Sequence, residues 1–289
     1  MIKSVIVDMD GTLLDDKNAI SEYTASVIKE FQKNGGVFVI NTGRSYTSAS
    51  KIVKEAKISC DYICLSGAAI YNAEGECIFC DTLNSEEVQE IRKLEEKNNV
   101  YVNYLTSEGV LSECSKERAK QYYLKEASLL AQKANKEFDE KEASQKYQWI
   151  LDMVHYNTDM NQKIKEDLPI YKAVVIGMTE LDAEKIKTEI QSYPTLLTAA
   201  TSPLSQEINA VRVDKGRAIL EYISANGILP EEVMVMGDSE NDLPMFEISF
   251  GKKIAMANAI EALKQICTDI TDSNTEDGVA HAIEKWGLK

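Results

Sequence analysis

Short apolar runs alternate with helical periodicity at both ends of the chain. Residues 5–7 and 37–40 are uninterrupted apolar runs, the pattern of strands buried on both faces of a parallel sheet. Between them, apolar positions recur at helical spacing over residues 23–31, after the favourable N-cap residue Ser21. Repetition of this order predicts an α/β fold with a doubly wound parallel sheet. Further helices are expected near 48–56 and 215–226, further strands near 62–65, 233–236 and 253–256, and a hairpin turning at 74–75.

The pattern changes between residues 83 and 206. Long charged helical stretches are expected at 85–98 and 115–146, with more alternating strands at 100–105, 149–154, 173–178 and 196–201. After about residue 207 the strand–helix alternation of the first part returns. We therefore predict a discontinuous core, residues 1–82 plus 207–289, interrupted by an inserted α+β domain over residues 83–206.

Composition narrows the choice of partners. Hydrophobic residues make up 44% of the chain and charged residues 27%, which is typical of a globular protein. The net charge of −15 argues against nucleic acid and anionic membrane surfaces as partners. No apolar stretch has the length of a membrane span and the first residues do not form a signal peptide, so a cytoplasmic location is expected. An anionic substrate would need local attraction from a metal and a few cations.

The cysteines include two closely spaced pairs. Cys60 with Cys64, and Cys77 with Cys80, loosely resemble the paired ligands of a zinc site. Because both pairs fall in apolar, strand-like segments rather than in turns, we predict buried reduced thiols, with zinc as the alternative.

Two carboxylates one residue apart follow the first predicted strand. Asp8 and Asp10 project to the same side if the strand continues, and they would face a ligand at the end of an open α/β sheet. Such close anions need a counter-charge, and Mg²⁺ prefers carboxylate oxygens. On this segment alone, a hairpin turn at Asp10 and Gly11 is the alternative.

Two further segments at strand–helix junctions contain polar residues. Thr42, Gly43 and Arg44 can contact a phosphate through a hydroxyl and backbone amides, or they form a turn followed by a surface arginine. Lys215 opens a predicted helix, where it either holds an anionic group or is solvated.

Acidic residues crowd the end of another predicted strand. Asp238 and Asp242 could complete an all-oxygen Mg²⁺ site with Asp8 and Asp10. The alternative is a helix N-terminus enriched in acids, which accounts for Asp242 but leaves Asp238 unexplained.

Together, these segments resemble the motifs of the haloacid dehalogenase superfamily, in the same order along the chain. Residues 8–14, 42–44, 215–216 and 237–242 resemble its first to fourth motifs, and residues 257–259 and 276–280 resemble C-terminal segments of its Cof-type phosphatases. The inserted domain stands where subclass IIB of the family carries a C2 cap.

The resemblance implies a phosphoric monoester hydrolase that uses Mg²⁺. Asp8 would be the nucleophile that becomes an aspartyl phosphate, and Asp10 would protonate the leaving oxygen and then activate water. Thr42 would donate a hydrogen bond to the phosphoryl oxygens, and Lys215 would neutralise charge on Asp8 and the transferring group.

The resemblance also implies the remaining contacts. The metal ligands would be Asp8, Asp238 and the backbone carbonyl of Asp10, with Asp242 supporting either the metal or Lys215. The substrate-binding residues would be Thr42, Gly43, Arg44, Lys215 and Asn241.

The expected substrate is a small phosphorylated metabolite, such as a sugar phosphate, a cofactor precursor or a nucleotide, and the expected assembly is a monomer or homodimer. A hexose-phosphate phosphomutase and a catalytically silent metabolite-binding protein are the alternatives. His155 is expected to be packed or to face substrate, and His281 to be structural.

Overall fold

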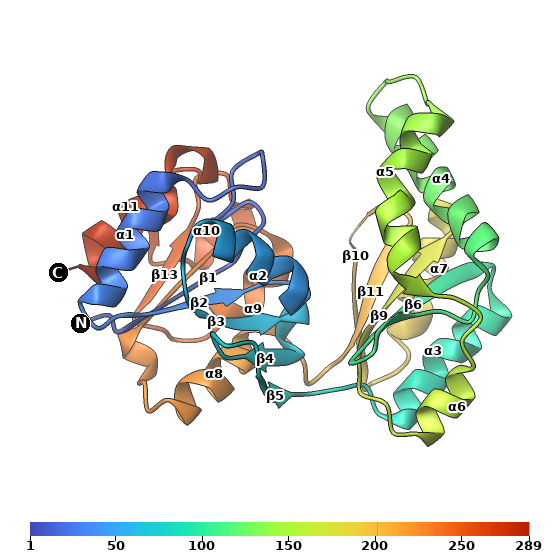
Figure 1. The fold of residues 1–289 in the computed structure, drawn as a ribbon, viewed down its shortest axis with the longest axis horizontal. Helices are drawn as coiled ribbons and strands as arrows, with labels where there is room; N and C mark the ends of the chain where they lie inside the picture. The colour runs from blue at the N-terminus through green and yellow to red at the C-terminus, as the bar shows by residue number, and fades with distance from the viewer. Residues whose placement is uncertain (201, 289) are drawn as a thin grey trace. The chain divides into compact units, whose positions relative to one another are not determined.

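The computed structural model describes residues 1–200 and 202–288, which fall into two compact units. The first unit contains Met1–Asp81 and Val213–Lys289, and the second contains Thr82–Arg212, so the second is one insertion into the first (Figure 1). The insertion ends at Arg212 rather than at the expected residue 206, because strand β11 (Ser205–Ala210) pairs with β9 and β10 of the second unit. Two residues of the expected ranges, 201 and 289, lie outside the described part of the chain.

An eight-stranded sheet in the order β14-β13-β12-β1-β2-β3-β4-β5 forms the centre of the first unit. Neighbours from β14 to β3 run parallel, and β4 and β5 add an antiparallel edge. The strands are β1 (Ser4–Val7), β2 (Val37–Asn41), β3 (Asp61–Cys64), β4 (Ala69–Tyr71), β5 (Cys77–Cys80), β12 (Val233–Gly237), β13 (Lys252–Ala255) and β14 (Asp269–Ile270). The predicted α/β class and doubly wound core are confirmed.

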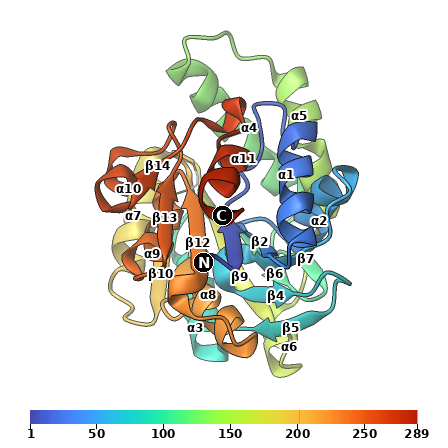
Figure 2. The same ribbon diagram turned by 90° about the vertical axis from the view of Figure 1, so that its left-hand side faces the viewer.

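The strand order of this sheet reverses between β1 and β12, which lie side by side in Figure 2. Because crossovers between parallel strands are right-handed, α1 and α2 cover one face of the sheet and α9 and α10 the other. The carboxyl ends of β1 and β12 meet at the reversal, where open α/β sheets bind ligands. The helices are α1 (Glu22–Lys33), α2 (Tyr46–Glu55), α8 (Lys215–Ala225), α9 (Leu243–Glu247), α10 (Glu261–Ile266) and α11 (Gly278–Ala282), with shorter turns at Leu65–Gly67, Pro230–Glu232, Glu240–Asp242, Asn274–Glu276 and Ile283–Gly287.

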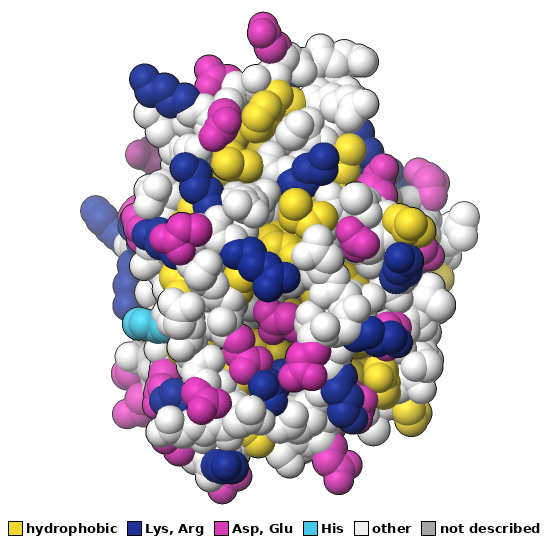
Figure 3. Space-filling view, turned by 90° about the vertical axis from the view of Figure 1, so that its right-hand side faces the viewer, with side chains coloured by type: hydrophobic (Ala, Val, Ile, Leu, Met, Phe, Trp, Pro, Cys, Tyr) yellow, Lys and Arg dark blue, Asp and Glu magenta, His cyan; other side chains and the backbone are white. Residues whose placement is uncertain are grey.

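The second unit has its own six-stranded sheet in the order β10-β11-β9-β6-β7-β8, antiparallel except for the β7–β8 pair. Tyr101 of β6 packs with Tyr122, Tyr123 and Tyr147 in an aromatic core. Acidic and basic side chains are interspersed on the face shown in Figure 3. Besides β11, the elements are α3 (Ser85–Lys97), β6 (Val100–Thr106), β7 (Gly109–Leu111), α4 (Lys116–Lys133), α5 (Glu140–Met153), β8 (Val154–His155), α6 (Met160–Lys165), β9 (Ile170–Gly177), α7 (Glu180–Ile190) and β10 (Leu196–Ala200).

Two predictions for the second unit are wrong. The expected helix 115–146 is divided into α4 and α5, because Asn135 adopts a left-handed backbone conformation and Asp139 caps a new helix. Residues 149–153 of the expected strand 149–154 are the last part of α5, because burial follows the four-residue spacing of Ala143, Tyr147 and Leu151, and only Val154 lies in a strand, β8.

The cysteines are free thiols, but they are not all buried. Cys60, Cys64 and Cys114 are buried, whereas Cys77 and Cys80 are exposed because β5 is an edge strand of the first sheet. The prediction of buried thiols is therefore wrong for the second pair. None of the helices in the described residues is long and apolar enough to cross a bilayer.

Candidate active site

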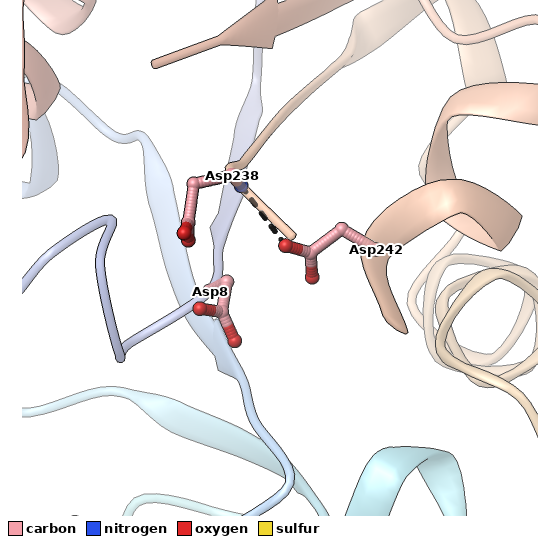
Figure 4. A group of neighbouring side chains, drawn as sticks. All are labelled: Asp8, Asp238 and Asp242. Carbon is pink, nitrogen blue, oxygen red and sulfur yellow. Dashed lines mark hydrogen bonds between the residues drawn. The ribbon is translucent and has the colours of Figure 1, made fainter. Parts of the chain in front are cut away.

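Three carboxylates converge at the point where the strand order reverses. Asp8 follows β1, Asp238 follows β12, and Asp242 lies just before α9 (Figure 4). One oxygen from each of the three lies within 4.8 Å of the others, and no other such cluster of acids, histidines or cysteines occurs in the described residues. This arrangement offers hard oxygen ligands to a cation.

Lys215 is the cation of this cluster. Its Nζ donates to Asp8 Oδ1 at 2.6 Å and to Asp242 Oδ1 at 2.7 Å, and the side chain is only 1% exposed. The helix that carries it, α8, is capped by Asp214, whose side chain accepts a hydrogen bond from the N–H of Arg217. The lysine is thus fixed between two carboxylates rather than solvated.

Asp242 fixes the loop after β12. Its Oδ2 accepts the backbone N–H groups of Asp238 at 3.0 Å (the dashed line in Figure 4) and Ser239 at 3.1 Å, while Oδ1 accepts Lys215. A Cβ at Gly237 would lie 2.7 Å from this carboxylate, so only glycine fits there. Because both oxygens of Asp242 are engaged, its direct effect is on Lys215 and on the backbone of Asp238.

Asp238 is held by the segment after Asp8. Thr12 Oγ1 donates to Asp238 Oδ1 at 2.8 Å. Gly11 has a φ of +80°, and a Cβ there would lie 2.5 Å from Asp238 Oδ2. Sequence reasoning assigned no role to Thr12; its position directly after the Asp10-Gly11 turn was the available signal.

Asp10 lies apart from the three-carboxylate cluster and pairs with Arg44. The Arg44 Nε donates to Asp10 Oδ2 at 2.8 Å, and its Nη2 donates to Asp10 Oδ1 and to Asn18. Sequence reasoning expected Arg44 to face substrate and did not anticipate this bidentate pair.

Thr42 directly follows Asn41, the last residue of β2. The Thr42 side chain is buried, and its Oγ1 accepts the backbone N–H of Arg44 at 3.1 Å, which leaves the hydroxyl proton free for another acceptor. Asn41, for which the sequence predicted no role, donates through Nδ2 to the backbone oxygen of Lys215 at 3.1 Å. This contact ties the start of α8 to β2.

The cluster contains three carboxylates and only one ammonium group, and this imbalance shifts the pKa values of its members. Burial raises the pKa of Asp8; Lys215 opposes the shift, and the charges of Asp242 and Asp238 add to it. Burial also raises the pKa of Asp238 to about 6. For Lys215, burial alone would lower the pKa, but Asp242 and Asp8 outweigh it and hold the ammonium charged. The cluster therefore suits a second cation, and its oxygen donors are those that Mg²⁺ prefers.

Neither histidine belongs to the cluster. His155 is exposed on β8 of the second unit. His281 Nδ1 lies 2.7 Å from Asp272 Oδ2 at the surface of the first unit. Asn241, by contrast, is near the cluster, since its Oδ1 lies 3.5 Å from Lys215 Nζ and accepts from Ser239.

Comparison with known proteins gives this site a context. The family model described as haloacid dehalogenase-like hydrolase matches residues 5–283. The chain is 28% identical to the 5-amino-6-(5-phospho-D-ribitylamino)uracil phosphatase YcsE of Bacillus subtilis, covering 99% of this chain and 96% of that protein. It is 27% identical to the phosphatase YwpJ of the same organism, covering 98% and 99%. A solved structure of a haloacid dehalogenase-like hydrolase from B. subtilis superposes with a TM-score of 0.79 at 25% identity, covering 99% and 100%.

Proposed function

The chain belongs to the haloacid dehalogenase-like hydrolase family, and from this premise we propose that it is a Mg²⁺-dependent phosphatase that hydrolyses small phosphorylated metabolites through a phosphoryl group carried on Asp8. The observation that carries the proposal is the 2.6 Å contact of Lys215 Nζ with Asp8 Oδ1 inside a buried group of carboxylates. A carboxylate fixed beside a cation is suited to attack an electrophilic phosphorus, since phosphoryl transfer depends on positioning and charge stabilisation.

In the first half-reaction, an Asp8 oxygen would bond to phosphorus while the bond from phosphorus to the leaving oxygen breaks. Asp10 would give a proton to that oxygen. In the observed arrangement the Asp10 carboxylate accepts hydrogen bonds from Nε and Nη2 of Arg44. It must therefore leave Arg44 and carry a proton before it acts as the acid.

In the second half-reaction, a water would attack the phosphorus on Asp8. Asp10 would take the proton of that water, and the electron pair of the Asp8–phosphorus bond would return to the Asp8 carboxylate. Lys215 would neutralise charge in both halves, and the free hydroxyl proton of Thr42 would reach a phosphoryl oxygen. The products are an alcohol and inorganic phosphate.

Asp8, Asp238 and the backbone carbonyl of Asp10 would hold the Mg²⁺, with Asp242 acting on Lys215 and on the Asp238 backbone. When bound, the metal would supply the positive charge that keeps Asp8 ionised and withdraws electron density from the phosphoryl group. The excess of carboxylates over cations in the cluster supports this assignment.

The second unit is proposed to select the substrate, and Gly43, Arg44 and Asn241 are proposed to contact it from the first. The first candidate substrate is 5-amino-6-(5-phospho-D-ribitylamino)uracil, for which the relative YcsE is named, because the two chains align over nearly their whole lengths. Other sugar phosphates and nucleotides form the rest of a substrate panel.

Phosphate release from p-nitrophenyl phosphate, measured with Mg²⁺ and with a chelator, tests the proposal. We expect activity that requires the metal and is abolished by Asp8→Asn. Asp16→Asn, which changes an exposed aspartate of the same segment, is the matched control and should retain activity. Activity that survives Asp8→Asn would contradict the assigned nucleophile, and phosphoryl transfer to a sugar without phosphate release would identify a phosphomutase.

A further inference from the structure

A β-bulge brings the two exposed thiols of strand β5 onto one face of the sheet. Cys80 pairs with Ala69 and Cys77 with Tyr71 on strand β4, and a register shift leaves Ile78 without a direct partner. Residues directly opposite each other project to the same side, and Ala69 and Tyr71 are two apart, so they share a face. Cys77 and Cys80 therefore share that face, although residues three apart in a regular strand point to opposite faces.

The Cys77 side chain is also directed along the strand toward its partner. Its Sγ donates to the backbone oxygen of Phe79 at 3.4 Å, and Phe79 is the residue next to Cys80. Partial burial raises the pKa of Cys77, and the Cys80 thiol raises it further through its charge and a hydrogen bond. Each sulfur thus lies within the electrostatic reach of the other.

Metal binding does not explain this pair. Structural zinc is held by four ligands, and the described residues contain no cluster of three or more potential ligands that includes Cys77 or Cys80. Both thiols are exposed on the last strand of the sheet, where a small reagent can approach. Accessible thiols on one face, without further ligands, are suited to thiol–disulfide exchange, because a small disulfide can reach either sulfur.

We propose that Cys77 and Cys80 form a redox-active site whose substrate is a low-molecular-weight disulfide such as oxidised glutathione. One thiolate attacks a sulfur of the external disulfide, forms a mixed disulfide and releases the first external thiolate. The second thiolate attacks the protein sulfur of the mixed disulfide, forms the Cys77–Cys80 bond and releases the second external thiolate. The protein loses two electrons and two protons, and the external disulfide becomes two thiols.

The second step is favoured because the two thiols are held on one strand. The nearby cysteine is present at a high effective concentration, so it displaces the external thiol before a second molecule can react. Cys80 is followed by Asp81, the last residue of the first unit before the insertion. The bridge therefore forms in the strand that leads into the second unit. This inference does not depend on the proposed phosphatase activity.

Thiol labelling of the full-length protein tests the proposal. The reduced protein is treated with oxidised glutathione, denatured, alkylated and weighed intact. We expect two fewer labels than the six cysteines of the untreated protein allow, no bound glutathione, and full recovery of labelling after reduction. Cleavage after Glu76 and Glu86 isolates residues 77–86, which contain both thiols and no other cysteine, so the bridge can be located in one peptide.

Single variants capture the intermediate. Cys77→Ser and Cys80→Ser should each retain one glutathione on the remaining thiol, whereas Cys267→Ser should form the bridge as the unaltered protein does. Combining Glu76→Cys with Cys77→Ser moves one thiol to the opposite face, because Glu76 lies opposite Asn72, the residue after Tyr71. That double variant should carry glutathione and no bridge.

Three results would overturn the proposal. These are two glutathione molecules on residues 77–86 without a bridge, thiols that remain free under conditions in which the single variants react, and a bridge that forms equally well in the Glu76→Cys, Cys77→Ser protein.

Discussion

The two units of this protein bury charge in different ways. In the first unit, the buried lysine and its acidic partners share one position at the end of β1 and β12, with more carboxylates than cations. In the second unit, three buried or partly buried cations each form an ion pair with an acid at a different place in the fold: Arg92 with Glu113, Lys172 with Glu207, and Arg212 with Glu87. Burial of charge alone is therefore no sign of an active site. An unbalanced group, with more carboxylates than cations, can bind a further cation, whereas a balanced, buried ion pair already holds its counter-charge and is destabilised when one partner is removed.

The largest effect is expected from removing the only cation of the unbalanced group. Lys215→Met leaves two buried carboxylates without a counter-charge and should lower turnover of p-nitrophenyl phosphate by at least about 10³-fold. Steady-state kinetics on folded protein measure this. Lys252→Met is the matched control, because that lysine pairs with Asp269 of the same unit while both side chains are 30% exposed. A Lys215 variant with near-normal turnover would mean that the cluster is only structural.

A balanced pair in the second unit should affect stability and not chemistry. Arg92 makes a bidentate contact with Glu113 and donates to Asn161 at 2.6 Å, so Arg92→Met should lower the free energy of unfolding by about 2–4 kcal/mol. Urea denaturation measures the loss of stability. At temperatures where the variant is folded, its turnover of p-nitrophenyl phosphate should stay within a few-fold of that of the unaltered protein. Lys133→Met breaks an exposed pair with Glu180 and should cost less than about 1 kcal/mol. A large loss of turnover in the Arg92 variant would break the distinction between the units.

One carboxyl of the second unit, Glu95, is buried without an ion-pair partner, and its effect should appear as a pH dependence of stability. Burial raises the pKa of Glu95 from 4.5 to about 7, and its Oε2 is buried without a hydrogen-bond partner. Between these two values the folded state holds a proton that the unfolded state has lost. The contribution of Glu95 to stability should therefore fall as pH rises through this window, by about 3 kcal/mol, and stay level above it.

Glu95→Gln should remove this contribution. Urea denaturation at pH 5 and pH 8.5 should show a smaller fall in stability for the variant than for the unaltered protein, because only the raised pKa values of Asp8 and Asp238 then contribute. Parallel pH profiles for the two proteins would show that Glu95 is not the group responsible.

The smallest effects are expected at the histidines. His281 pairs with Asp272, but both side chains are exposed, so His281→Gln should change the unfolding free energy by less than about 1 kcal/mol. His155→Gln and His281→Gln should each alter turnover of p-nitrophenyl phosphate by no more than about twofold, because no proposed step uses a histidine. A loss of 10²-fold or more in either variant would require a different acid or base from Asp10.

The same contrast between the units explains how much the sequence could predict. In the first unit, continuous apolar runs define parallel strands, and the polar residues that follow them meet at one edge by topology alone. Asp8, Asp238 and Asp242 could therefore be predicted to lie together, whereas Lys215 was placed beside Asp8 by the motif resemblance; the structure brings all four together.

Contacts that depend on side-chain direction could not be predicted. The Thr12–Asp238 bond, the Asn41 contact with the backbone of Lys215 and the Asp10–Arg44 pair each join residues that no spacing relates. The elements of the second unit were harder to predict, because one residue with a left-handed backbone, Asn135, divides a helix whose apolar periodicity continues on both sides. Residues 149–153 have local strand character, but the helical periodicity set by Ala143 and Tyr147 places them in α5.

The central claim is that Asp8 carries the phosphoryl group while Asp10 donates and accepts the protons. The Asp10→Asn variant tests this claim most directly. p-Nitrophenolate is a good leaving group that needs little protonation, so the first half-reaction should persist while water activation fails. Rapid mixing with p-nitrophenyl phosphate and Mg²⁺ should then release a burst of p-nitrophenol close to one per enzyme. Mass spectrometry of the quenched protein should locate the phosphoryl group on Asp8. A variant that turns over steadily without a burst, or a phosphoryl group found on another residue, would contradict the account.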